Sequence, residues 1–233
     1  MEKVVYKLLP FLFVLGVAAC NNTTGNREKQ EVAHPIENNT PQTKSEEKMI
    51  LFFGNSLTAG YGLEPDKAFP GLLQQRIDSL GLKYKVINAG LSGETTASGN
   101  TRIDWVLNQK VDIFVLELGG NDGLRGISTE ETRKNLQQMI DKIRSKYPDC
   151  QIILAGMQIP PNMGPEYTAS FRTIFPEIAE KNQVALIPFL LESVGGEPHL
   201  NQPDGIHPNE KGHKIVAENV WKVLKQFLTE EIS

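Results

Sequence analysis

A serine and a histidine at opposite ends of the chain have neighbours that suit acyl chemistry. Ser56 is the third residue after the apolar segment 49–53. Asp204 and His207 stand three residues apart in the run Asp-Gly-Ile-His-Pro, which lets the carboxylate fold back on the imidazole. A hydroxyl nucleophile, a histidine base and a carboxylate that orients the base are the groups that cleave an ester through an acyl intermediate. The sequence therefore predicts nucleophilic catalysis by Ser56.

Hydrolysis of this kind also needs hydrogen-bond donors for the negative charge that develops on the acyl oxygen. Asn121 carries a side-chain amide just after the apolar run 111–118. Gly93 can present a backbone N–H group with no side chain in the way, and the N–H group of Ser56 would be a third donor. We therefore expect an oxyanion hole built from Ser56, Gly93 and Asn121.

Apolar runs alternate with segments of helical periodicity from residue 49 onward, which predicts strands alternating with helices. Such alternation predicts a parallel sheet with helices on both faces, and chemistry at the carboxyl ends of the strands. Pro176 should bend its helix or start it afresh. The predicted strands are 49–53, 85–89, 111–118, 151–157 and 184–188, and the predicted helices are 69–80, 98–107, 128–147, one through 171–179, and 210–228.

The first 48 residues differ in composition from the rest. Two lysines precede the apolar stretch 8–19, which is typical of a secretory signal and too short to cross a membrane. The stretch ends in Val-Ala-Ala-Cys, which resembles the bacterial lipoprotein box. We expect residues 1–19 to be removed, Cys20 to be lipidated and residues 20–48 to form a disordered tether. The predicted location is the bacterial cell envelope, facing the periplasm or the cell surface.

Length and charge limit the remaining possibilities. A chain of 233 residues with a formal net charge of −4 fits one domain, predicted at 49–233, and offers no basic footprint for nucleic acid. His34, His199 and His213 lack the clustering of metal ligands, so no metal is expected. We also expect no cofactor and a monomeric protein, with an acyl ester or thioester substrate and the membrane as its partners.

Several short motifs occur together in the order and spacing of the SGNH, or GDSL, hydrolase family. The segments 117–126 and 157–160 resemble its bacterial members described as thioesterase, lysophospholipase and arylesterase. The resemblance covers residues 49–230. The motifs are Gly-Asn-Ser-Leu at 54–57, Gly93, Gly-Asn-Asp at 120–122 and Asp-Gly-Ile-His-Pro at 204–208.

This resemblance implies Ser56 as nucleophile, Gly93 and Asn121 as oxyanion donors, and Asp204 with His207 as the rest of a triad. It also implies a single-domain, flavodoxin-like three-layer α/β/α sandwich with a mostly parallel five-stranded sheet. One departure is Asn55, where the family usually has aspartate. The resemblance implies that this residue braces the loop rather than reacts, so the expected effect of the change is modest.

Three hypotheses on function remain open at this stage. The leading one is an esterase, thioesterase or lysophospholipase, whose long acyl chain would need an apolar channel lined by Leu124, Met157, Ile159 and Pro160. The second is a carbohydrate O-acetylesterase, which would need a small acyl site and a polar, often aromatic, sugar cleft. The third is a non-catalytic binding lipoprotein of the same fold, and the complete set of candidate residues argues against it.

Overall fold

Five strands form one sheet that is parallel throughout. The computed structural model describes residues 47–228; the predictions made for the signal peptide, Cys20 and nearly all of the tether lie outside the described residues. The strand order is β2-β1-β3-β4-β5, and every neighbouring pair is parallel, which confirms the predicted sheet. The strands are β1 (Lys48–Gly54), β2 (Tyr84–Gly90), β3 (Ile113–Glu117), β4 (Gln151–Ala155) and β5 (Ala185–Ile187).

Two neighbouring interior strands, β1 and the central β3, are buried on both faces. Residues 50–54 of β1 and all of β3 are buried, as expected for near-continuous apolar runs inside a parallel sheet. Strand β2, at one edge, is only partly buried. The most hydrophobic segments of the described chain therefore lie side by side at the centre, and their carboxyl ends meet at the same edge.

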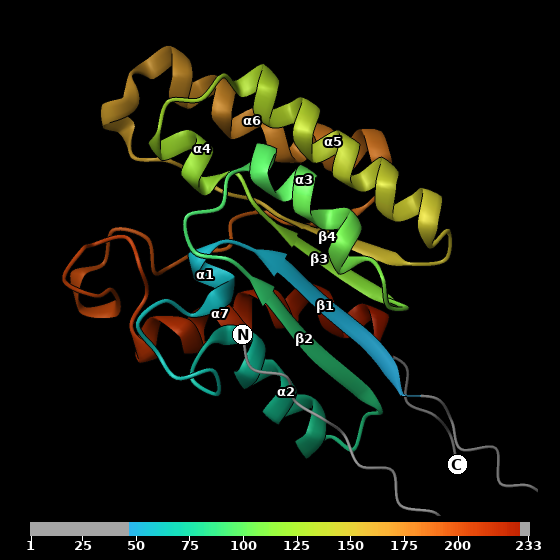
Figure 1. The fold of residues 1–233 in the computed structure, drawn as a ribbon. Helices are drawn as coiled ribbons and strands as arrows, with labels where there is room; N and C mark the ends of the chain where they lie inside the picture. Colours follow the sequence, from blue (N-terminus) through green and yellow to red (C-terminus); the bar gives the residue numbers. More distant parts are fainter. Residues whose placement is uncertain (1–46, 229–233) are drawn as a thin grey trace, which may run out of the picture. The chain divides into compact units, whose positions relative to one another are not determined.

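Helices cover both faces of the sheet, which gives three layers (Figure 1). On one face α3 contacts α5 and α5 contacts α6, while α2 contacts α7 on the other. Within residues 47–228 no helix has the length and apolar character needed to cross a bilayer. The longer helices are α2 (Phe69–Ser79), α3 (Thr96–Val106), α5 (Thr129–Lys146), α6 (Pro165–Asn182) and α7 (Glu210–Leu224), and the 3-10 turns are η1 (Pro161–Met163), η2 (Pro198–Leu200) and η3 (Lys225–Phe227).

Helix α6 continues through Pro176, so the expectation that the helix starts afresh there is wrong. A proline inside a helix removes the hydrogen bond to the carbonyl group four residues earlier. Pro176 and Arg172 both lie on the exposed face of α6, where that carbonyl group can bond to water. The helix keeps its buried face, which includes Phe171, Ile174 and Phe175.

Two short helices stand where the sequence predicts turns or loops. Helix α1 (Ser56–Ala59) follows β1 directly, and α4 (Gly120–Leu124) follows β3. Asn55 caps α1 by accepting a hydrogen bond from the Leu57 amide, and Gly60, with φ of 73°, ends the helix in the left-handed region. Helices of four or five residues are too short to show a hydrophobic period, so the sequence does not reveal them.

Helix α1 lies close against the end of β2. A Cβ atom added to Gly90 would stand 2.2 Å from the backbone nitrogen of Ala59, which a side-chain movement cannot relieve. The absence of a side chain at Gly90 therefore lets α1 sit directly on the carboxyl edge of the sheet, as Figure 1 shows. This contact places Ser56, the first residue of α1, at that edge.

Candidate active site

Ser56, His207 and Asp204 form one chain of hydrogen bonds. The Oγ atom of Ser56 lies 2.9 Å from Nε2 of His207, and Nδ1 of His207 lies 2.7 Å from Oδ2 of Asp204. A longer contact of 3.4 Å joins Ser56 Oγ to Oδ1 of Asn55. The fold thus brings the serine and the histidine, 151 positions apart in sequence, into direct contact.

The charge of Asp204 determines which nitrogen of His207 carries the proton. Partial burial raises the pKa of Asp204, but hydrogen bonds from the His207 backbone and ring and from the Ile206 amide outweigh it, and the pKa falls to about 2. An ionised carboxylate can only accept, so Nδ1 of His207 must donate to it. In the neutral ring this leaves Nε2 as an acceptor for the Ser56 hydroxyl proton.

A tight turn and an aromatic ring hold His207 in place. Oδ1 of Asp204 accepts the backbone amides of Ile206 and His207, each at 3.0 Å. The ring of Tyr61 lies against the imidazole, with 4.6 Å between ring centroids. No motif singles out Tyr61 in the sequence; its place just after the serine motif, between two glycines, is a signal that could have identified it.

The predicted oxyanion donors come from three segments that meet at this edge. Nδ2 of Asn121, in α4, donates one hydrogen bond to the carbonyl oxygen of Glu94 at 3.0 Å. A side-chain amide has a second N–H group, which is left for another acceptor. Gly93 has φ of 81°, a conformation that favours glycine, and its amide, like that of Ser56, has no partner within residues 47–228. Ser56 and Asn121 line the cavity described below, whereas Gly93 does not.

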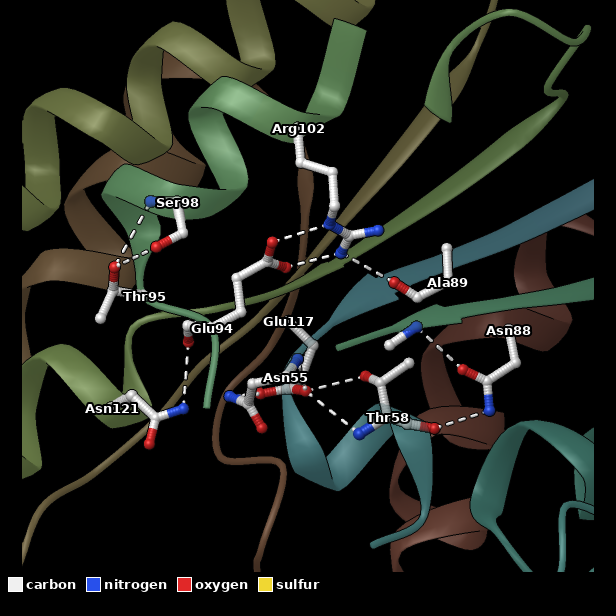
Figure 2. A network of polar contacts seen from close by, with 11 residues as sticks. Asn55, Thr58, Asn88, Ala89, Glu94, Thr95, Ser98, Arg102, Glu117 and Asn121 are labelled. Carbon is white, nitrogen blue, oxygen red and sulfur yellow. Dashed lines mark hydrogen bonds and ion pairs between the residues drawn. The ribbon is translucent and has the colours of Figure 1, made fainter. Parts of the chain in front are cut away.

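An ion pair that the sequence analysis did not anticipate supports the loop after β2. Glu94 is buried, and its carboxylate accepts from Nε and Nη2 of Arg102 at 2.7 and 2.6 Å. Nη2 of Arg102 also donates to the Ala89 carbonyl group at 2.9 Å, as Figure 2 shows. Arg102 therefore fixes the loop that carries Gly93 to helix α3 and strand β2. The same loop contains the Glu94 carbonyl group, which accepts a hydrogen bond from Asn121.

A second buried carboxylate, also missed, lies beneath Ser56. Glu117, at the end of β3, is fully buried and accepts hydrogen bonds from Asn55 and Thr58 (Figure 2). Burial raises the pKa of Glu117 to about 7, although the hydrogen bonds from Thr58 and Asn55 oppose the rise. A charged residue inside the apolar run 111–118 is a signal that could have identified it from sequence.

The serine and histidine open into a cavity of about 380 Å³. Leu124, Met157, Ile159 and Pro160, the expected acyl-channel residues, all line it, together with Ser56, Asn121 and His207. The loop after β5 adds Phe189 and Leu191, which the sequence did not single out. The cavity therefore joins a polar end, at the serine, to a largely apolar wall. In the described part of the chain no three His, Cys, Asp or Glu residues are grouped so as to hold a metal ion.

A serine, histidine and aspartate joined in this way are the arrangement of serine hydrolases, which recurs on unrelated folds. The model of the GDSL-like lipase/acylhydrolase family matches residues 52–215. The chain is similar to esterase TesA of Pseudomonas aeruginosa, with 40% identity over 180 residues that cover 77% of this chain and 89% of the relative. It is also similar to thioesterase 1/protease 1/lysophospholipase L1 of Escherichia coli, with 35% identity over 183 residues, 78% of this chain and 86% of the relative.

A crystal structure of TesA has a TM-score of 0.74 to this chain at 40% identity, and covers 78% of this chain and all of the other. The matched range, 52–215, spans the positions of Ser56, Gly93, Asn121, Asp204 and His207. The chain belongs to the GDSL-like lipase/acylhydrolase family.

The buried ion pair yields a prediction on stability. Arg102→Met leaves the Glu94 carboxylate buried without its cation, and we expect it to lower the free energy of unfolding by about 3 kcal/mol. Lys142→Met is the matched control, because its ion pair with Asp104 is more exposed, with side-chain exposures of 34% and 65%. The control should cost less than about 1 kcal/mol. Urea unfolding of both variants measures the difference, and equal costs would contradict the supporting role of Arg102.

Proposed function

We propose that this protein hydrolyses carboxylic ester and thioester bonds of acyl substrates, with Ser56 as nucleophile, His207 as general base and Asp204 as the residue that orients it. The observation that carries the proposal is the hydrogen-bonded chain from Ser56 to Asp204 at the mouth of an apolar cavity. The names of relatives at 35–40% identity, esterase and thioesterase/lysophospholipase, support it.

The proposed reaction begins with proton transfer from Ser56 Oγ to Nε2 of His207 as the serine attacks the acyl carbon. The negative charge on the former carbonyl oxygen is stabilised by the second N–H group of the Asn121 side chain and by the amides of Gly93 and Ser56. Asp204 remains ionised and stabilises the imidazolium that forms. His207 then gives its proton to the leaving alcohol or thiol, and water, activated by the same imidazole, releases the acyl group from Ser56.

The cavity walls favour an acyl chain longer than acetate. Leu124, Met157, Ile159 and Pro160 present apolar surface next to the serine, and each methylene buried there contributes about 0.8 kcal/mol to binding. An O-acetylesterase would leave most of this surface without a ligand. We therefore propose acyl esters and thioesters, including lysophospholipids, as the substrate class, and treat acetylated carbohydrate as an alternative outcome of the test.

The first test replaces the nucleophile. Ser56→Ala should fold normally and lose several orders of magnitude in kcat, because no hydroxyl remains to form the acyl intermediate. Turnover of p-nitrophenyl esters and labelling by a fluorophosphonate probe measure this. Labelling that persists in Ser56→Ala would place the nucleophile elsewhere.

The same assay, run from acetate to palmitate with acyl-CoA and acetylated xylan alongside, addresses the substrate class. We expect kcat/KM to rise with chain length beyond acetate, since the acyl wall is apolar. A preference for acetate together with activity on acetylated xylan would support the carbohydrate O-acetylesterase instead.

The second test is the pH dependence of kcat/KM. His207 accepts a proton only when its ring is neutral, so activity should rise as the imidazole loses its proton and then reach a plateau. Asp204, with its pKa lowered to about 2, stays ionised and adds no limb at mildly acidic pH. Glu117, whose pKa is raised by burial to about 7, ionises in the same range, so a rise is assigned to His207 only where E117Q retains it. Initial rates between about pH 5 and pH 9 measure the profile, and a flat one would contradict His207 as the base.

We also propose that the enzyme is an exported lipoprotein, tethered through lipid on Cys20. The support is the sequence of residues 1–20, whose apolar stretch ends in small residues before the cysteine. Strand β1 already begins at Lys48, so the proposed tether ends at residue 47. As a flexible chain, residues 21–47 would have a root-mean-square span of about 30 Å, which would keep the enzyme near lipid substrates.

The third test concerns this anchor. Cys20→Ala, exported through another signal, should be soluble and keep its kcat/KM on a soluble ester, because the anchor contributes nothing to the chemistry. It should be slower than the anchored enzyme on lysophospholipid presented in membranes. Mass spectrometry of the wild-type N-terminus and membrane fractionation check the modification. A wild-type protein that is unlipidated would contradict the anchor.

A further inference from the structure

Glu117 is joined to residues on both sides of Ser56. Its Oε2 atom accepts from the Asn55 amide at 3.1 Å, the Thr58 amide at 3.3 Å and the Thr58 hydroxyl at 2.7 Å. Its Oε1 atom accepts from Nδ2 of Asn55 at 2.7 Å. All three side chains are at most 2% exposed. Figure 2 shows the Glu117 carboxylate beside Asn55 and Thr58, with dashed lines to Thr58.

Every group that faces the carboxylate of Glu117 within hydrogen-bond distance is positioned to donate. An ionised carboxylate is purely an acceptor, so it suits two backbone amides, a side-chain amide and a hydroxyl at once. A side-chain amide in its place would direct its own N–H group at one of these donors. A buried donor left without an acceptor is costly, so the turn would have to move.

The side chain of Asn55 can adopt only one orientation in this arrangement. Its Nδ2 group donates to Glu117, while its Oδ1 atom accepts from the Leu57 amide at 2.9 Å. With the Asn55 amide turned around, its oxygen would face the Glu117 carboxylate and its N–H group would face the Leu57 amide, so neither contact would be a hydrogen bond. Asn55 therefore links Glu117 to the first turn of α1, where Ser56 lies.

We propose that Glu117 is a positioning residue for Ser56: through Asn55 and Thr58 it holds the turn that aims the serine hydroxyl at His207. The proposal rests on the function proposed for Ser56. Glu117 takes no part in proton transfer, since the hydroxyl of Ser56 donates to Nε2 of His207 and makes no hydrogen bond to Glu117. A displacement of about 1 Å of a reacting group is enough to slow an enzyme by about a hundredfold.

The test is a double-mutant cycle assayed at about pH 8, where a carboxylate of pKa about 7 is ionised. E117Q keeps the shape but sets its N–H group against Nδ2 of Asn55. We expect kcat to fall about 10- to 100-fold with KM within about twofold, because the serine is misaimed while the acyl cavity is intact. The rate of fluorophosphonate labelling of Ser56 should fall in parallel.

The double variant N55D/E117Q reverses the polarity of the contact. In this variant the side-chain amide at position 117 donates to the carboxylate at position 55. The amide oxygen at position 117 still accepts from the backbone N–H group of residue 55 and from Thr58. N55D alone restores the aspartate that the family usually has at this position. Its carboxyl group would share one proton with Glu117 across the contact of 2.7 Å, so its kcat should stay close to that of the wild type. We expect N55D/E117Q to recover at least about tenfold in kcat over E117Q.

Asn182→Ala is the matched control, because it removes a buried amide that bonds to Gln137 and to the Ile178 carbonyl group at the far end of α6. It should lower Tm and leave kcat unchanged.

Wild-type kcat in E117Q, or a double variant no faster than E117Q, would overturn the positioning role alone. If E117Q does not fold, a folded N55D/E117Q whose kcat is within about tenfold of the wild type supports the role, and a slower one overturns it. A wild type that cleaves no ester would instead overturn the proposed function, and the positioning role with it.

Discussion

The parallel pairing of β1 with β3 is the constraint on which the rest of the site depends. Gly54 is paired with Glu117, so the last residues of the two strands are adjacent. Because both strands point the same way, the segments that follow them, with Ser56 in α1 and Asn121 in α4, emerge at one edge. The hydrophobic burial of β1 and β3 drives this pairing, and the placement of the polar groups follows from it.

Two buried carboxylates beneath that edge are satisfied in different ways. Glu94 is neutralised by Arg102, which also donates to the Ala89 carbonyl group, so a loop is tied to a helix by charge. Among residues 47–228 no cation bonds to Glu117, which is held by the amides and side chains of Asn55 and Thr58. The Glu94–Arg102 ion pair holds a loop at some distance from the serine. The neutral donors instead attach the Glu117 carboxylate to the turn that carries Ser56. Both arrangements leave the buried groups hydrogen-bonded, as an interior of low polarity requires.

Much of the site could be predicted because several of its residues lie close together in short sequence motifs. Asp204 and His207 are three residues apart, and the turn between them needs nothing from the rest of the fold to bring carboxylate and imidazole together. Leu124, Met157, Ile159 and Pro160 follow strands that the apolar pattern reveals, and all four line the cavity. Tyr61, Arg102 and Glu117 could not be assigned in this way, since their partners lie in other elements. Of the two outcomes expected at Pro176, a bend or a fresh start of the helix, the fresh start is wrong, because on the exposed face of α6 the carbonyl group that loses its partner can bond to water.

The sequence by itself determined the alternation of strands and helices, hence a parallel sheet, and the identity of the serine, histidine and aspartate. Periodicity and short-range spacing are local properties, and local properties can be read without coordinates. Only the tertiary structure decided that Ser56 Oγ lies 2.9 Å from His207 Nε2, that Asn121 is oriented by the Glu94 carbonyl group, and that Glu117 lies beneath the serine turn. These contacts depend on strand order and on the close approach of α1 to Gly90, which arise from packing between segments distant in sequence.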